Sequence, residues 1–339
     1  MVDLRSDTAT RPSAQMRATM AAAEVGDEQR FEDPQVNALC ERVAELLGQD
    51  AAVFLPSGTM CNAIAFRLHL DRPGSEAILH RTSHPILYEG GQPAAYSAGM
   101  VRPLDSPDGT FTGDDVRAAV HDPTNRYAPR SRLVSVEQTA NEPGGRLWPL
   151  ERVDGVLAAA VEHGLRTHLD GARLFNAVVA TGTPAERWAS GFDSAWIDFS
   201  KGLGAPMGAC LAGPVGFIEE AWRLKQMTGG ALRQAGIVAA AALFALERNV
   251  DRLADDHARA RTLADGLAQL PGIDIAPAEV ETNIVRFGVA DPVTWCAELA
   301  EHGVLMAPLN ATQVRAVTHL DVDDDGIDAA LVAAARIAG

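Results

Sequence analysis

The spacing of apolar residues near the start of the chain predicts a helix, then a strand, then a second helix. From Val36 to Leu47, apolar residues recur every three or four positions, and Gly48 follows them. This is the spacing of an amphipathic helix that ends at a glycine. Ala51–Leu55 is a short apolar run, typical of a buried strand, and Pro56-Ser57-Gly58-Thr59 leads from it into a helical stretch from Met60 to Leu70.

Further short apolar runs alternate with helical stretches along the next part of the chain. The predicted strands are Ala77–Leu79, Arg132–Val136, Arg166–Leu169, Ala195–Phe199 and Ala209–Ala212. Helical stretches such as Leu150–His163 and Phe217–Gln226 separate several of them. Short apolar strands that alternate with helices indicate an α/β fold, in which a largely parallel sheet is covered by helices on both faces.

The pattern changes near residue 245. Two long helices are predicted there, over Gly236–Leu253 and Asp256–Leu270. Shorter strands at Thr282–Phe287 and Val314–His319 follow, with helices around Val293–His302 and Asp328–Ile337. We therefore expect two domains: a large domain over residues 1–245, whose N-terminal segment contributes to the active site, and a smaller α/β domain over residues 246–339.

Composition narrows the classes of protein and of partner. The chain has 339 residues, of which 47% are hydrophobic and 22% charged, as in a folded globular protein. It contains no apolar run of about 18 residues, and its first residues are too polar for a secretory signal. A net charge of −16 disfavours nucleic acid and membranes as partners. Four widely spaced cysteines are typical of reduced thiols, so we expect a cytoplasmic protein.

Lysine is almost absent. Only two of the 29 cationic side chains are lysines, Lys201 and Lys225. Arginine keeps its proton near neutral pH, so it cannot act as a nucleophilic amine. Lys201 follows a predicted strand in Ser200-Lys201-Gly202. A lysine in that position can form a Schiff base with an aldehyde when it is partly desolvated. The alternative is a surface lysine in a turn.

An aspartate stands at the end of another predicted strand, in Leu169-Asp170-Gly171-Ala172-Arg173. Ligands of open α/β sheets bind at the carboxyl ends of strands. Asp170 could hold the protonated ring nitrogen of pyridoxal phosphate, whose ring then acts as an electron sink. The alternative is an aspartate that caps a helix and forms a structural ion pair.

Two other segments are candidates for contacts with a cofactor. Ser57, Gly58 and Thr59 precede a helix, where backbone N–H groups and hydroxyls bind phosphate, although an ordinary helix cap explains them too. His84 could stack on an aromatic cofactor or transfer a proton, or it could be a structural histidine. No metal site is expected: the histidines lack metal spacing, and the acidic run from Asp321 has Val332 where a calcium loop needs a carboxylate.

These residues together resemble the low-specificity L-threonine aldolases, over essentially the whole chain. The family's N-terminal signature resembles Asp3-Leu-Arg-Ser-Asp-Thr-Ala-Thr-Arg-Pro12. Later motifs follow in the family's order, and they are Val25-Gly-Asp27, Asp33-Pro34, Phe54-Leu-Pro-Ser-Gly-Thr59, His168-Leu-Asp-Gly-Ala-Arg-Leu-Phe-Asn-Ala177, Ser200-Lys-Gly-Leu-Gly204, Met227-Thr-Gly-Gly230, Arg233-Gln234 and Arg315-Ala-Val-Thr-His319. The resemblance implies the fold type I architecture of pyridoxal phosphate enzymes, of the aspartate aminotransferase kind.

The resemblance also implies a role for each matching residue. Lys201 would carry the cofactor as a Schiff base, Asp170 would pair with its ring nitrogen, and His84 would stack on the ring. The phosphate would be held by Gly58 and Thr59, with Ser57, Ser200 and Arg233 beside them. Ser6, Arg173 and Arg315 would bind the α-carboxylate of an amino acid substrate. Members of the family are typically homotetramers that share active sites between subunits.

The chain departs from the family's pattern at three places. It has Ala140 where the family has a histidine near the substrate hydroxyl, and Arg30-Phe31 where the family has Tyr-Gly. Gln226 replaces a family lysine, while Lys225 stands one position earlier, about 100° away around a helix. All three changes are expected on the substrate side of the site.

Three functions are therefore compared. The first is retro-aldol cleavage of L-threonine, L-allo-threonine or a related β-hydroxy-α-amino acid to glycine and an aldehyde, with His84 or a held water as the base. The second is β-elimination, or transfer of the glycyl unit to another aldehyde, on the same cofactor. The third is a catalytically reduced homologue that binds a ligand and regulates or scaffolds.

Overall fold

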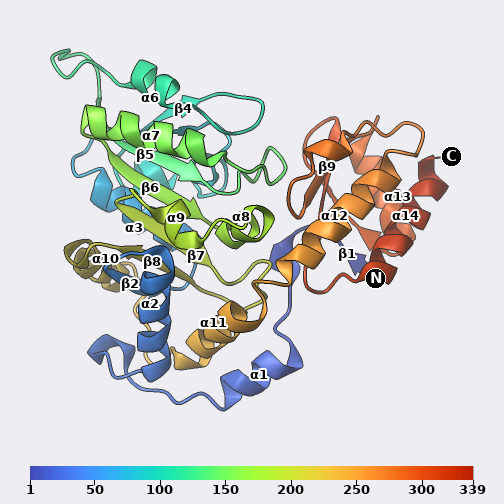
Figure 1. Cartoon of the computed structure of the whole chain (residues 1–339), viewed down its shortest axis with the longest axis horizontal. Coiled ribbons are helices and arrows are strands. Elements are labelled where there is room, and N and C mark those ends of the chain that lie inside the picture. The colour runs from blue at the N-terminus through green and yellow to red at the C-terminus, as the bar shows by residue number, and fades with distance from the viewer. Residues whose placement is uncertain (339) are drawn as a thin grey trace.

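A seven-stranded sheet forms the centre of the larger part of the molecule (Figure 1). The computed structural model describes residues 1–338. In the order across the sheet, the strands are β2 (Ala51–Leu55), β8 (Ala209–Gly213), β7 (Ser194–Asp198), β6 (Arg166–Gly171), β5 (Arg130–Glu137), β3 (Ser75–His80) and β4 (Met100–Leu104). β8 runs antiparallel to both of its neighbours, and the other pairings are parallel. The expected α/β fold with a mostly parallel sheet is confirmed; β4 was not expected from the sequence.

Helices cover both faces of this sheet. Successive residues of a strand point to opposite faces, so a strand that is apolar throughout presents apolar side chains to the helices on both sides. In β2, Val53 and Leu55 pack on one face with α3 (Gly58–His69) and α10 (Val215–Met227). Phe54, between them, belongs to the larger core on the other face. That core includes residues of α1 (Ala14–Ala21), α2 (Pro34–Leu47), α6 (Gly113–Ala119), α7 (Leu150–His163), α8 (Leu174–Thr181), α9 (Ala185–Ala189) and α11 (Gly236–Arg248). Two short helices, α4 (His84–Leu87) and α5 (Gln92–Ala95), follow β3.

A second hydrophobic core lies beside the first, coloured orange to red in Figure 1. Its antiparallel sheet has the order β11 (Ala307–Pro308), β12 (Gln313–Val317) and β9 (Ile284–Gly288). Three helices pack on it: α12 (Leu253–Leu267), α13 (Pro292–Glu301) and α14 (Asp324–Ala338). The N-terminal strand β1 (Val2–Asp3) pairs with β10 (Val304–Leu305), and Leu4 packs in this core. The division at residue 245 stays a prediction.

The local helix signals were accurate where caps are strong. Gly48 ends α2 in the left-handed conformation, with φ of 60°, and α7 has the expected bounds. The single helix expected over Gly236–Leu253 is wrong, since α11 ends at Arg248 and α12 begins at Leu253. Asn249 explains the break, because its side-chain amide donates 2.7 Å to the carbonyl oxygen of Leu203.

Three short 3₁₀ helices complete the chain: Asp7–Ala9, Glu28–Arg30 and Pro277–Glu279. The acidic run from Asp321 leads into α14, where the Asp323 carboxylate accepts from the N–H of Gly326 at 2.9 Å. None of the helices within residues 1–338 combines the length and apolar character needed to cross a bilayer.

Candidate active site

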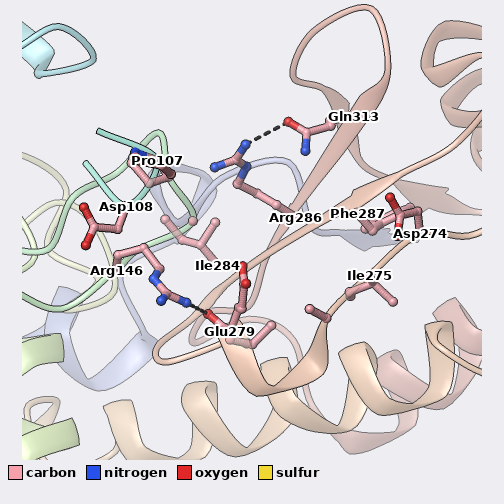
Figure 2. Close-up of a pocket in the computed structure, with 14 residues that line it drawn as sticks. Pro107, Asp108, Arg146, Asp274, Ile275, Glu279, Ile284, Arg286, Phe287 and Gln313 are labelled. Atoms are coloured by element: carbon pink, nitrogen blue, oxygen red, sulfur yellow. Dashed lines mark hydrogen bonds between the residues drawn. The ribbon is translucent and has the colours of Figure 1, made fainter. Parts of the chain in front are cut away.

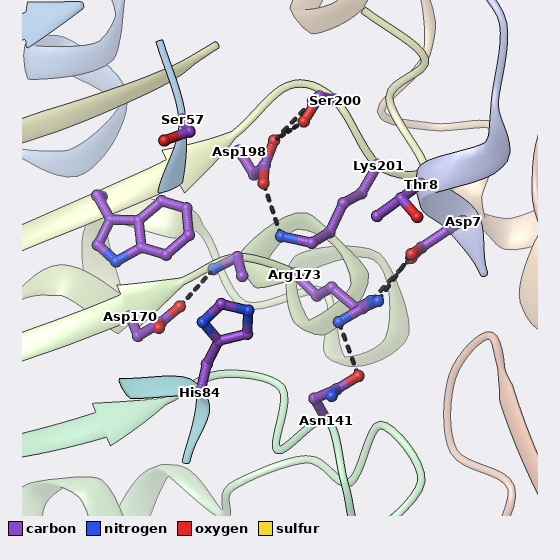
Figure 3. A network of polar contacts seen from close by, with 12 residues as sticks. Asp7, Thr8, Ser57, His84, Asn141, Asp170, Arg173, Asp198, Ser200 and Lys201 are labelled. Atoms are coloured by element: carbon purple, nitrogen blue, oxygen red, sulfur yellow. Dashed lines mark hydrogen bonds and ion pairs between the residues drawn. The ribbon is translucent and has the colours of Figure 1, made fainter. Parts of the chain in front are cut away.

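Acidic side chains gather where three neighbouring parallel strands end. Glu137 ends β5, Asp170 is the last residue but one of β6, and Asp198 ends β7. Parallel strands share one carboxyl edge, and ligands of α/β sheets bind there. Figure 3 shows Lys201, His84 and Arg173 around the same space. The structure therefore brings together residues that the sequence could only name separately.

Lys201 lies just beyond β7, with its amine next to Asp198. The Nζ atom is 2.6 Å from Asp198 Oδ2, and 16% of the lysine side chain is exposed. The other oxygen of Asp198 accepts from the backbone N–H and the hydroxyl of Ser200, each at 2.7 Å. This short loop holds the amine at the edge of the sheet with a fixed counter-ion. Lys201 is therefore not a surface lysine in a turn.

Asp170 is buried without a cation. Its side-chain oxygens accept from the Asn62 amide at 2.8 Å and from the Ala172 N–H at 3.1 Å. Within residues 1–338 no lysine, arginine or histidine nitrogen comes within 4.0 Å of it. Beside it in register lies Glu137, and burial together with the charge of Asp170 raises the pKa of Glu137 well above its usual range. This part of the site favours a positively charged partner for Asp170.

The segment before α3 is shaped for a close approach to the sheet. A Cβ atom added to Gly58 would lie 2.2 Å from Cη2 of Trp196, so a side chain does not fit there. Ser57 and Thr59 on either side are exposed. The Ser57 hydroxyl caps the helix by accepting from the Met60 N–H at 3.3 Å. The helix start is thus both a cap and an open set of backbone N–H groups beside the site.

His84 begins the short helix α4 and is fixed by a carboxylate. Its Nδ1 lies 2.8 Å from Oε1 of Glu89, and one third of its side chain is exposed. The Tyr88 ring lies on its other side, with 5.5 Å between ring centroids. Burial, with the neighbouring Glu142 carboxylate, raises the pKa of Tyr88 to about 12, so this hydroxyl stays protonated at physiological pH.

Arg173 is held by an N-terminal residue. Its Nε and Nη2 donate to the two oxygens of Asp7 at 2.8 and 2.7 Å, and Nη1 donates to Asn141 at 3.1 Å. Burial would raise the pKa of Asp7, but Arg173 outweighs it and the pKa falls to about 2. A guanidinium has five N–H donors, so two remain for another carboxylate.

The structure does not bring all the predicted residues together. Arg233 is 66% exposed and lies 3.6 Å from Asp27. Ser6 caps the first 3₁₀ helix through Thr8. Arg315, on β12, is directly opposite Arg286 on β9, and its buried Nε has no hydrogen-bond partner within residues 1–338. The roles expected for these three residues stay predictions.

A cavity of about 460 Å³ lies between the two cores, and none of these residues lines it (Figure 2). Arg146 and Arg286 line it; Arg146 donates to the Glu279 carbonyl at 2.7 Å, and Arg286 to the Gln313 side chain at 2.8 Å. Its lining includes no lysine and none of the predicted site residues. Because Schiff-base chemistry needs an amine, we place the active site at the sheet edge rather than in this cavity.

The positions that depart from the family's pattern have distinct surroundings. Ala140 is buried, and its methyl group can neither accept a proton nor donate a hydrogen bond. Phe31 adopts a φ of 58°, normally a glycine conformation, and its ring lies 5.4 Å from that of Trp222. Lys225 is fully buried and its Nζ lies 2.9 Å from Glu28, while Gln226 is exposed. Lys225 therefore does not point where Gln226 does.

Sequence reasoning missed several residues of the site: Asp7, Asn62, Glu89, Asn141 and Asp198. Asp7 lies next to Ser6 inside the N-terminal motif, and Asp198 lies in the predicted strand that precedes Lys201, so their adjacency was an available signal. Asn62 and Glu89 gave no such signal. Asn62 is a polar residue within a helix and Glu89 lies between two short helices, and only the fold shows that they meet.

Comparison with known proteins places the chain in a family. The family described as Beta-eliminating lyase matches residues 3–290. Low-specificity L-threonine aldolase 1 of Arabidopsis thaliana is 41% identical over 327 residues, covering 94% of this chain and 91% of the relative. The low specificity L-threonine aldolase of Escherichia coli K12 is 41% identical over 324 residues, covering 95% of each. The chain belongs to the low-specificity L-threonine aldolase family. It is a pyridoxal phosphate-dependent lyase.

Solved structures agree on the fold. A threonine aldolase from Leishmania major superposes with a TM-score of 0.86 at 21% identity, over all of both chains. An aspartate aminotransferase from Rhizobium meliloti gives 0.70 at 15% identity, over 99% of this chain and 90% of the other. The predicted fold type I architecture is confirmed by the fold that the chain shares with these two structures.

The residues present fit pyridoxal phosphate. The amine of Lys201 is held at the sheet edge, and Asp170 is a buried carboxylate that lacks a cation, which a protonated ring nitrogen would supply. Gly58 leaves space where a Cβ would collide with Trp196, which itself lies 5.7 Å below the Lys201 amine. These three features would suit a covalent anchor, a charge partner and a phosphate-binding helix start within one site.

Proposed function

We propose that this chain cleaves L-threonine, L-allo-threonine or a related β-hydroxy-α-amino acid to glycine and an aldehyde. The proposal rests on one observation: the Lys201 amine and the buried Asp170 carboxylate lie at the ends of two neighbouring strands, and Asp170 has no cation of its own. The names of the relatives, low-specificity L-threonine aldolases at 41% identity, support the same substrate class.

The chain's residues divide the work of holding the cofactor. Lys201 anchors it, and Asp170 keeps the proton on its ring nitrogen. Gly58 and Thr59, with Ser57, Ser200 and Arg233, hold the phosphate; exposed hydroxyls at the start of α3 support this. When bound, pyridoxal phosphate accepts the electron pair that is released as the Cα–Cβ bond breaks.

Three residues bind the substrate's carboxylate. Arg173 offers its two remaining N–H donors, and Asp7 fixes the direction in which they point. Arg315 contributes a second guanidinium from β12, and Ser6 a hydroxyl from the N-terminal segment. The carboxylate would thus be held by elements from both cores, which orients the Cα–Cβ bond.

His84 takes the proton of the β-hydroxyl. Ala140 cannot accept a proton, and His84 is the histidine that lies beside Asp170 and Lys201 in Figure 3. Its ring would also stack on the cofactor. A general base of this kind contributes roughly 10²–10⁴-fold to the rate.

A second function, β-elimination or transfer of the glycyl unit to another aldehyde, is favoured by one observation: the matched family is described as Beta-eliminating lyase. The two functions differ in their products. Aldol cleavage releases glycine and an aldehyde, whereas elimination releases ammonia and a keto acid.

The test is incubation of the holoenzyme with L-threonine, L-allo-threonine and phenylserine, with quantification of aldehyde, glycine, ammonia and keto acid. We expect equal amounts of glycine and aldehyde from at least one substrate. Ammonia and keto acid without glycine would replace this proposal by elimination. A holoenzyme that produces neither pair of products from the panel would contradict both.

We also propose that the protein is a cytoplasmic homotetramer with shared active sites. All four cysteines are free thiols, which supports a reducing compartment. Phe31 and Met227 are 64% and 59% exposed, and Phe31 contacts Trp222 of the same helix α10 that carries Met227. Exposed apolar side chains of this kind suit contact with a second copy. Light scattering on the purified protein would show a mass near 36 kDa if this proposal is wrong.

A further inference from the structure

A buried amide joins the acid beside the cofactor's ring to the acid beside His84. Asn62, on α3, donates one hydrogen bond of 2.8 Å to Oδ2 of Asp170 and another of 2.8 Å to Oε1 of Glu89. Glu89 is also the partner of His84, whose Nδ1 lies 2.8 Å from the same Oε1 atom. Four side chains from separate elements thus form one continuous chain of contacts.

The orientation of the Asn62 amide is determined by its other neighbour. Its Oδ1 lies 2.8 Å from Nε1 of Trp196, an indole nitrogen that can only donate. The Asn62 oxygen must therefore face Trp196, and its NH₂ group must face the two carboxylates. Both hydrogens of that group are used, one on Glu89 and one on Asp170.

These contacts decide where His84 carries its proton. An ionised carboxylate can only accept hydrogen bonds, so Oε1 of Glu89 accepts both from the Asn62 amide and from Nδ1 of His84. Nδ1 of His84 must then hold the hydrogen, and Nε2 keeps its lone pair. The Glu89 side chain is fully buried, and its second oxygen has no hydrogen-bond partner within residues 1–338. His84 is thus the one titratable group that donates to Glu89.

Other charged groups surround His84 from the elements packed against it. Tyr88 directly follows α4, Glu137 ends β5 and Asp170 lies on β6. Burial raises the pKa of Glu89, although the hydrogen bonds from His84 and Asn62 oppose this effect. Burial also raises the pKa of Tyr88, so both neighbours hold protons more tightly than usual. Of these groups, only the Glu89 carboxylate contacts a ring nitrogen of His84.

We propose that Glu89 is a positioning residue for the aldol cleavage: it keeps His84 protonated on Nδ1, so that Nε2 can accept the proton of the substrate's β-hydroxyl. This rests on the proposed function. As the O–H bond breaks, an N–H bond forms at Nε2, the C=O bond of the aldehyde forms, and the Cα–Cβ electron pair goes to the bound cofactor. The imidazolium is then paired with the Glu89 carboxylate. The proton returns to Cα, glycine leaves, and the protein's protonation is unchanged.

Asn62 links the position of Glu89 to that of Asp170. Because the same amide holds Asp170, any movement of Glu89 also disturbs the acid that faces the cofactor's ring nitrogen. With Ala140 in place of the family histidine, the chain depends on this one histidine, and its orientation depends on Glu89.

The first test reads the tautomer directly. In protein labelled with ¹⁵N-histidine, with the His84 signals assigned from an H84Q variant, the wild type should show protonated Nδ1 and unprotonated Nε2 near pH 8. Glu89→Met removes the acceptor that faces Nδ1 and should let the hydrogen move to Nε2, whereas Glu89→Gln, whose oxygen can still accept from both Asn62 and His84, should keep it on Nδ1. A wild-type His84 protonated on Nε2 would overturn the proposal without any measurement of activity.

The second test is kinetic, and it separates positioning from folding. In Glu89→Gln we expect kcat on L-threonine to fall about 10²-fold with KM changed less than about threefold, and the acid limb of the kcat/KM profile to move to lower pH because His84 loses its anionic partner. Glu89→Asp, which keeps the charge, should recover part of kcat and of the profile. Unchanged kcat and pH profile in Glu89→Gln would refute the proposal.

The chain offers a matched control. Glu76, on the same strand β3 that precedes His84, lies 3.4 Å from Nε2 of His121 and is equally buried. Glu76→Gln should leave kcat and its pH profile unchanged. Should the wild type cleave no β-hydroxy amino acid while His84 is protonated on Nδ1, the proposed reaction fails and the tautomer assignment stands. Should it cleave threonine while Glu89→Gln behaves as wild type, only the present inference fails.

Discussion

Replacing Asp7 by asparagine should weaken both the fold and the binding of substrate. Asp7 is fully buried and forms two hydrogen bonds, of 2.8 and 2.7 Å, with Arg173, of which only 7% is exposed. Asparagine has nearly the same shape, but it leaves the guanidinium buried without its counter-ion. Breaking a buried pair in this way costs about 3–5 kcal/mol. We take about 3 kcal/mol, because the asparagine oxygen still accepts one hydrogen bond.

The pH dependence gives the same pair a second signature. In the folded protein the pKa of Asp7 is about 2, against an ordinary 3.8, since Arg173 outweighs the effect of burial. A carboxyl with a lowered pKa stabilises the fold above its unfolded pKa, and this contribution is lost as the pH falls toward the folded pKa. The displacement corresponds to about 2.4 kcal/mol at neutral pH, of which roughly 1 kcal/mol is lost by pH 3.

The assay is urea unfolding of wild type and Asp7→Asn between pH 7 and pH 3, followed by tryptophan fluorescence and circular dichroism. The difference in unfolding free energy should be largest at neutral pH and about 1 kcal/mol smaller at pH 3. Asp328→Asn, on an exposed part of α14, is the control and should show no such trend. A difference between Asp7→Asn and wild type that does not vary with pH would refute the assignment of the pH effect to this pair. We also expect KM for L-threonine to rise at least tenfold, because Arg173 loses its orientation.

Three further outcomes follow from the site and the core. Lys201→Ala should abolish aldehyde production and leave the purified protein without the absorbance of a cofactor Schiff base, read in a spectrophotometer. Gly58→Ala should weaken cofactor affinity at least tenfold in an equilibrium titration and destabilise the fold by about 1–3 kcal/mol in urea, because its Cβ would lie 2.2 Å from Trp196. Lys225→Met should cost about 3–5 kcal/mol in the same urea assay by stranding the buried Glu28, and adding Glu28→Leu should restore most of the loss.

The sequence predicted what local signals determine. The bounds of α7 and the end of α2 at Gly48 follow from apolar spacing and a glycine stop within one segment, and both are correct. The alternation of strands and helices was sufficient for the mostly parallel sheet. Segments that depend on distant partners were not predictable. The two-residue strand β1 has no periodicity, and its partner β10 lies some 300 residues away. The break after Arg248 depends on a hydrogen bond from Asn249 to Leu203.

The candidate site divides in the same way. Lys201 and Asp170 could be found because each lies at the carboxyl end of a predicted strand. The carboxyl ends of parallel strands lie at the same edge of a sheet. Their partners could not be found, because Asn62 lies within a helix and Glu89 in a turn, and neither position has a characteristic neighbour in the sequence. A carboxylate's role depends on what its oxygens face, and this is a property of the assembled fold.

The departures from the family's pattern are therefore best judged by what surrounds them. Ala140 is buried next to Asn141, which contacts Arg173, and it cannot transfer a proton, so the change bears on the chemistry. Lys225 is sequestered by Glu28 in the interior, so it does not substitute for a lysine at the position of exposed Gln226. Arg30 and Phe31 are exposed, and Phe31 lies beside Trp222. Of the three changes, the loss at position 140 places the greatest demand on the residues that remain, and His84 with Glu89 is the pair equipped to meet it.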